Sequence, residues 1–140
     1  QEDLPYSIGK AITLQEGSDI GLIATGVMLH RTLQAAELLA KKGIKATVVD
    51  AHTIRPLDKE TILQVARRTG GLVVAEDHNI NGGLGSAVCE VVAEEYPVPV
   101  ARIGLPDVFG ESGAPDLLLD EFGMSVKDLV EAAEKIIRRK

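Results

Sequence analysis

Four short runs of apolar, mostly β-branched residues constrain the fold of this chain more than any other feature. They cover residues 20–25, 46–50, 72–76 and 98–103. Stretches with helical periodicity separate the runs, and the runs are apolar throughout, without the alternation of a strand that has one face in water. Continuous apolar strands joined by helices are typical of a parallel sheet with helices on both faces. The sequence therefore predicts an α/β fold with three layers, α/β/α.

Helix signals lie between and after these runs. The first helix is predicted over Leu29–Lys42, with Gly43 as the terminating glycine, and the second begins after Asp58, a good N-cap residue. A third is predicted over Leu84–Tyr96, and a final helix starts at Ser125 in a capping-box pattern. Each helix has an apolar stripe that can cover the sheet.

Two further elements and the domain limits follow from spacing. Lys10–Leu14 predicts a strand that only a short turn separates from the next run, and this short spacing favours an antiparallel pairing, because parallel neighbours need a long crossover. Pro115–Phe122 predicts a short helix after a loop. The length of 140 residues fits one domain, 1–140, with residues 1–7 as a linker.

Composition excludes several classes of protein. The net charge is −6 and the longest basic cluster is residues 138–140, which argues against nucleic acid as a partner. No apolar run approaches the roughly 20 residues that span a bilayer, so a membrane location is not expected. The one cysteine, Cys89, cannot form an internal disulfide, which favours a cytoplasmic protein.

A glycine-rich segment at residues 82–86 (GGLGS) is the first candidate site. It follows a strand and opens a helix, where backbone amides can hold phosphate. The match to a dinucleotide-binding pattern is poor, because Val88 occupies the last glycine position and a loop replaces the tight turn. We favour the alternative that the glycines allow close packing of the helix start.

Two acidic and histidine clusters, Asp50–His52 and Glu76–His78, form the second candidate. Each lies at the carboxyl end of a predicted parallel strand, the edge where open α/β sheets place their sites. Histidine and carboxylate could ligate zinc or exchange protons, but a structural zinc site needs four ligands. Helix capping, loop hydrogen bonds or a subunit contact explain such residues more often.

The third candidate is Ser112, within residues 109–113 (FGESG), with Glu111 beside it. A nucleophile elbow requires glycines two positions before and after the serine, and in this segment Gly113 directly follows the serine, in the wrong frame. A hydrolase is therefore not favoured. The residues contain no convincing catalytic constellation.

Several ordered segments resemble the C-terminal domain of transketolase and related thiamine-diphosphate enzymes. Residues 6–11 (YSIGKA), 24–26 (ATG), 53–58 (TIRPLD), 76–78 (EDH) and 82–86 carry the resemblance. The late segment 109–115 (FGESGAP) and the triplet 76–78 favour the transketolase branch. Two alternatives stay open: 1-deoxyxylulose-5-phosphate synthase, and the β subunit of a 2-oxo acid dehydrogenase E1, whose tail docks a partner.

The resemblance implies a function that other domains carry out. It implies transfer of a two-carbon ketol unit between phosphorylated sugars, with thiamine diphosphate and a divalent metal such as Mg²⁺ bound by other domains. It also implies a five-stranded mixed sheet, a homodimer of the full enzyme, and contact with thiamine-binding domains or a split N-terminal subunit. Because Gln1 is the first residue, we expect an excised or processed segment that is inactive alone.

On this reading, no residue of the chain is catalytic, and none binds the cofactor or the metal. The polar, glycine-rich strand edge is interpreted as a docking or loop surface. Its predicted members are His52, Glu76, His78, Gly82, Gly83, Gly85, Glu111 and Ser112.

Overall fold

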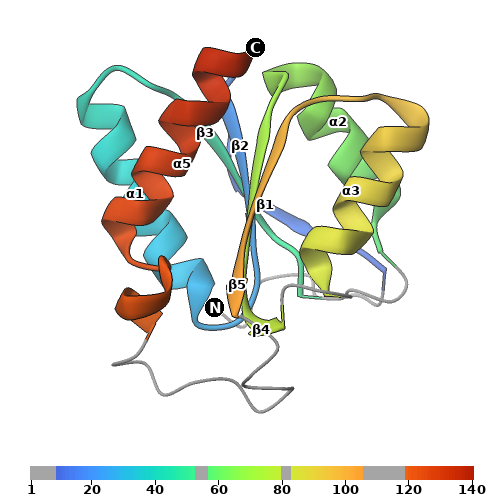
Figure 1. Ribbon diagram of the computed structural model, residues 1–140. Coiled ribbons are helices and arrows are strands. Elements are labelled where there is room, and N and C mark those ends of the chain that lie inside the picture. Colours follow the sequence, from blue (N-terminus) through green and yellow to red (C-terminus); the bar gives the residue numbers. More distant parts are fainter. Residues whose placement is uncertain (1–8, 53–56, 80–82, 106–118) are drawn as a thin grey trace.

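A five-stranded mixed sheet forms the centre of the protein (Figure 1). The computed structural model describes residues 9–52, 57–79, 83–105 and 119–140. The strand order is β1-β3-β2-β4-β5, and β1 runs antiparallel to β3 while the other pairs are parallel. The predicted sheet, with its antiparallel first strand, is confirmed, but β1 pairs with β3 and not with β2, the next strand along the chain. The strands are β1 (Ile12–Gln15), β2 (Ile20–Ala24), β3 (Ala46–Asp50), β4 (Leu72–Asn79) and β5 (Val100–Leu105).

Helices cover both faces of the sheet, giving the predicted three layers. Figure 1 shows α1 and α5 on one side and α2 and α3 on the other. None of the described helices combines the length and apolar composition needed to cross a bilayer. The helices are α1 (Met28–Lys41), α2 (Lys59–Thr69), α3 (Leu84–Glu95) and α5 (Val126–Arg139), with a 3-10 turn, η2 (Asp120–Phe122).

The sequence-based boundaries agree with the structure to within a few residues. β4 extends three residues beyond the predicted Glu76, and β5 begins two residues later than predicted. The start of the short helix predicted from Pro115 and the 1–7 linker lie outside the described residues. The described part of that short helix is the 3-10 turn η2.

The core consists of two aliphatic clusters separated by the sheet. One contains Leu22 and Leu129 and lies under α1 and α5; the other contains Ile23 and Ile62 and lies under α2 and α3. Successive residues of a strand point to opposite faces, so neighbours Leu22 and Ile23 enter different clusters. Every residue of β2 and β3 is buried, which explains why these strands are mostly apolar; Thr47 and Asp50 of β3 are the buried polar exceptions. Each large aliphatic side chain buried here contributes roughly 1.5–3 kcal/mol.

Asp58 caps α2, as predicted, and also ties the N-terminal segment to that helix. Its Oδ1 accepts the Thr61 N–H at 3.2 Å, and its Oδ2 accepts the Thr61 hydroxyl at 2.7 Å and the Ala11 N–H at 2.9 Å. Burial raises the pKa of Asp58, but these hydrogen bonds, together with the charge of Lys10, outweigh burial and lower it below its usual value.

Candidate functional site

The carboxyl ends of the parallel strands meet at one edge of the sheet, where the predicted clusters lie. Asp50 is the last residue of β3 and is buried, and His52 follows it in a half-buried position. Glu76 lies in β4, beside β2 in the sheet. The two sequence clusters therefore lie at the same edge of the sheet, on β3 and β4, with β2 between these strands.

Glu76 caps the start of α3 from within the core. Its side chain is 1% exposed, and its two carboxylate oxygens accept the backbone N–H groups of Leu84 at 2.9 Å and Gly85 at 2.8 Å. The N-cap residue itself, Gly83, has no side chain to do this. The first amides of a helix carry partial positive charge, so a carboxylate there is favourable. Glu76 thus serves inside the domain and is not part of its outer surface.

This cap determines what the glycine-rich segment can bind. A phosphate held by α3 would need the amides that Glu76 already occupies, and it would face the negative charge of that carboxylate. Gly85 is needed for packing: a Cβ there would lie 3.0 Å from Cγ and Cδ of Arg102, which crosses the helix from β5. The described part of the segment fits the packing interpretation favoured from the sequence.

The remaining predicted residues do not assemble into a reactive site within the described part of the chain. His78 lies in β4, near its end. Gly82, Glu111 and Ser112 fall outside the described residues. Among the residues that the structure describes, no group of three or more His, Cys, Asp or Glu side chains could hold a metal ion.

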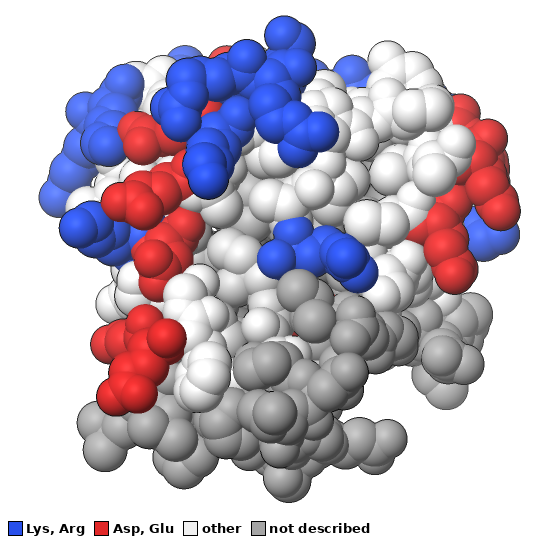
Figure 2. Space-filling view, in the orientation of Figure 1, with Lys and Arg blue, Asp and Glu red and all other residues white. Residues whose placement is uncertain are grey.

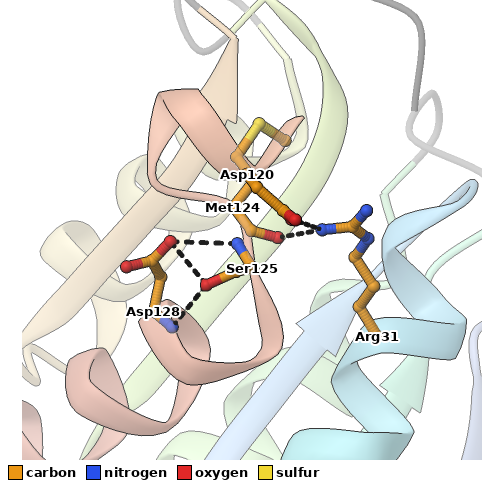
Figure 3. A network of polar contacts seen from close by, with 5 residues as sticks. All are labelled: Arg31, Asp120, Met124, Ser125 and Asp128. Atoms are coloured by element: carbon orange, nitrogen blue, oxygen red, sulfur yellow. Dashed lines mark hydrogen bonds and ion pairs between the residues drawn. The ribbon is translucent and has the colours of Figure 1, made fainter. Parts of the chain in front are cut away.

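A second polar network, missed from the sequence, joins α1 to the segment before α5 (Figure 3). Arg31 of α1 donates through Nη1 to Asp120 Oδ1 at 2.6 Å and to the Met124 carbonyl at 3.0 Å. Beside it, Ser125 and Asp128 form the predicted capping box: Ser125 Oγ accepts the Asp128 N–H at 3.1 Å, and Asp128 Oδ2 accepts the Ser125 N–H at 3.0 Å. The network fixes the start of α5 against α1.

Sequence reasoning could not have found the Arg31 contact. Arg31 and Asp120 are 89 positions apart, and nothing in their local sequence distinguishes them from other surface charges. The capping box, by contrast, is a signal within four residues.

The fold and these contacts define a structural α/β domain whose helix N-terminus is filled by its own carboxylate. A family model described as "Transketolase, C-terminal domain" matches residues 9–129. The chain belongs to this family.

Curated relatives come from two kinds of enzyme. The chain is 45% identical over 139 residues to a 6-deoxy-6-sulfo-D-fructose transketolase subunit from Clostridium sp. (strain MSTE9), covering 99% of this chain and 43% of that protein. It is 46% identical over 142 residues to a 1-deoxy-D-xylulose-5-phosphate synthase from Desulforudis audaxviator (strain MP104C), covering 100% of this chain and 22% of that protein. The chain thus spans less than half the length of these relatives.

Solved structures agree with the family assignment. A structure titled "Split gene transketolase, inactive beta4 tetramer" is similar with a TM-score of 0.89 and 42% identity, covering 99% of this chain and 44% of that one. Transketolase from Leishmania mexicana shares the fold at a TM-score of 0.64 and 18% identity, covering 94% of this chain and 18% of that one.

Proposed function

We propose that this chain is the C-terminal section of a transketolase, an enzyme that transfers a two-carbon ketol group between phosphorylated sugars. The observation that carries the proposal is the 45% identity, over 99% of the chain, to a transketolase subunit. The similarity to a split-gene transketolase supports the same branch.

The role we assign to this section is assembly and docking, without chemistry. The buried Glu76 carboxylate uses its oxygens on the domain's own helix, and the described residues offer no set of metal ligands. Thiamine diphosphate and a divalent metal are therefore assigned to other domains of the enzyme, or to a separate N-terminal subunit. We propose that the complete enzyme is a homodimer. We also propose that it is cytoplasmic, which is consistent with a free cysteine, Cys89.

The first experiment asks whether the chain has activity by itself. The 140-residue chain is incubated with thiamine diphosphate, Mg²⁺, a ketose phosphate donor and an aldose phosphate acceptor. No transfer product is expected, because the described residues supply no cofactor site. Measurable turnover by the isolated chain would refute the assembly role.

The second candidate is the C-terminal domain of 1-deoxy-D-xylulose-5-phosphate synthase, because a relative of that name is 46% identical over the whole chain. Mass spectrometry of products from the complete enzyme separates the two. Exchange of two carbons between two sugar phosphates supports the transketolase. Accumulation of 1-deoxy-D-xylulose 5-phosphate instead supports the synthase.

A further inference from the structure

The outer edge of β5 is open within the described part of the protein. β5 pairs only with β4, and the strand order places it at the end of the sheet. The Leu72 N–H donates to the Pro99 carbonyl at 3.0 Å. Because the direction of backbone groups alternates along a strand, the amides of Val100, Arg102 and Gly104 point away from β4. These outward groups are a template for another strand.

This edge has some of the features that limit strand addition and lacks others, since the pairing of β5 with β4 shifts register between Ala75 and Asn79. Val100–Leu105 contains no proline and one charged residue, Arg102. The Arg102 side chain lies over Gly85 and donates to Ser86 Oγ at 3.4 Å, so it is directed toward α3 and does not shield the backbone. Figure 2, which views the molecule in the orientation of Figure 1, shows uncharged side chains around a basic group in the middle of this face, with further charged groups on either side.

A groove continues from this edge onto α5. It has a volume of about 970 Å³ and is lined by β5 residues and by one side of α5. The charged residues on this side of the helix change from acidic to basic along its length. Asp128, Glu131 and Glu134 come first, and Lys135, Arg138 and Arg139 follow. Glu134 is already paired with Lys42 at 2.8 Å. Within the described residues, no ion pair involves Glu131 or Lys135.

We propose that this surface, the β5 edge with the adjoining side of α5, binds a second copy of the same chain across a two-fold axis. The two β5 strands pair antiparallel and join the sheets into one of ten strands. The two α5 helices then lie antiparallel on the same face of that sheet. A two-fold contact uses the same patch on both copies, so the patch must complement itself.

The charge order along α5 meets that requirement. In an antiparallel arrangement centred at the level of Ala133, Glu131 of each copy lies beside Lys135 of the other. Asp128 comes close to the basic end of the helix, and the small Ala132 side chain permits close approach. A parallel arrangement would set like charges together, which is unfavourable. The outward amides of β5 would form the hydrogen bonds between the two strands, and the charges on α5 would favour the antiparallel orientation of the two copies.

This inference assigns the proposed assembly role to a particular surface, and it rests on that proposed function. Its test measures self-association of the 140-residue chain and involves no substrate or cofactor. The enzyme assignment and the proposed contact can therefore fail independently.

The first experiment removes one outward amide. Arg102→Pro deletes an N–H that β4 does not use and keeps a backbone angle that an edge strand accepts. Arg102→Ala is the matched control, because it loses the same side chain and keeps the N–H. Sedimentation velocity from about 1 µM to about 1 mM should show association of the wild type and Arg102→Ala, weakened at least about 10-fold in Arg102→Pro.

Circular dichroism must show that both variants fold, and a charge exchange keeps the proposal testable if Arg102→Pro does not. Glu131→Lys sets like charges together twice in each dimer, so association should weaken about 10-fold or more at low salt. The double variant Glu131→Lys with Lys135→Glu should restore it to within about 3-fold of the wild type.

Three results overturn the proposal. The wild-type chain could stay monomeric over the whole concentration range. Arg102→Pro, if folded, could associate as tightly as Arg102→Ala. The double charge exchange could fail to restore what Glu131→Lys removes, which would mean that the contact lies elsewhere or involves a different partner.

Discussion

Replacing Glu76 by glutamine tests whether a buried charge holds the start of α3. The side chain keeps its length and one oxygen, so one backbone N–H retains its acceptor. The other N–H, of Leu84 or Gly85, instead meets an amide NH₂ group in a site that is 1% exposed. A buried donor without an acceptor costs about 1–3 kcal/mol, and the lost charge at the helix terminus adds up to about 2 kcal/mol.

One effect opposes this loss. Folding must dehydrate the Glu76 carboxylate, and a neutral glutamine reduces that penalty by an amount of similar order. We expect a net destabilisation of about 2 kcal/mol, because both oxygens have short, well-directed donors. In a domain of this size, that corresponds to a fall of roughly 6–10 °C in Tm.

The assay is urea and thermal unfolding of the 140-residue chain, followed by circular dichroism. Glu90→Gln is the matched control. It makes the same chemical change at an exposed position of α3 that takes no part in the cap. Glu90→Gln should shift the free energy of unfolding by less than about 0.5 kcal/mol. If Glu76→Gln is as stable as Glu90→Gln, or more stable than the wild type, the carboxylate does not stabilise α3 and the reasoning is wrong.

Four further substitutions test other contacts. Asp58→Asn should lower the free energy of unfolding by about 1–2 kcal/mol above pH 4. The difference from the wild type should shrink as the pH falls below about 4, because the pKa of Asp58 is lowered in the folded state and protonation removes the stability that the carboxylate contributes. Unfolding curves at several pH values check this. Arg31→Met should destabilise the protein more than Asp120→Asn does, because it removes both the ion pair and the hydrogen bond to the Met124 carbonyl. Asp120→Asn removes only the ion pair, and because Asp120 is largely exposed it should cost under about 1 kcal/mol. Equal losses in urea unfolding would mean that the hydrogen bond to the Met124 carbonyl contributes nothing. Gly21→Ala should destabilise by about 1–3 kcal/mol, because its Cβ would lie 2.5 Å from Val65 Cγ1 and 2.7 Å from Leu72 Cδ2; an unchanged Tm would contradict that packing.

The layered fold could be predicted because its signals are local. Burial on both faces makes a strand apolar throughout, and this character is visible in five residues of β3, Ala46–Asp50, whose predicted and observed bounds coincide. Ser125 and Asp58 could be assigned as helix caps because their partners lie three residues away. The antiparallel direction of β1 followed from a connection to β2 too short for a crossover, but its actual partner in the sheet, β3, did not.

The candidate site was harder to interpret from sequence. Glu76 looks like an exposed acid at a strand end, and only the structure shows both of its oxygens bound to the helix that starts eight residues later. The local sequence gives no signal for this role, because a single carboxylate at the end of a strand can be solvated, catalytic or a helix cap. The distinction depends on where α3 begins in space.

The sequence by itself determined the α/β class, the helix caps and the membership of the transketolase C-terminal domain family, because these rest on short-range patterns and ordered motifs. Only the tertiary structure decided that the amides of α3 hold an internal carboxylate, that Arg31 secures the segment before α5, and that β5 presents an open edge. The physical reason is that hydrophobic periodicity acts between near neighbours in the chain. Polar partners and strand edges are set by the order in which distant segments pack.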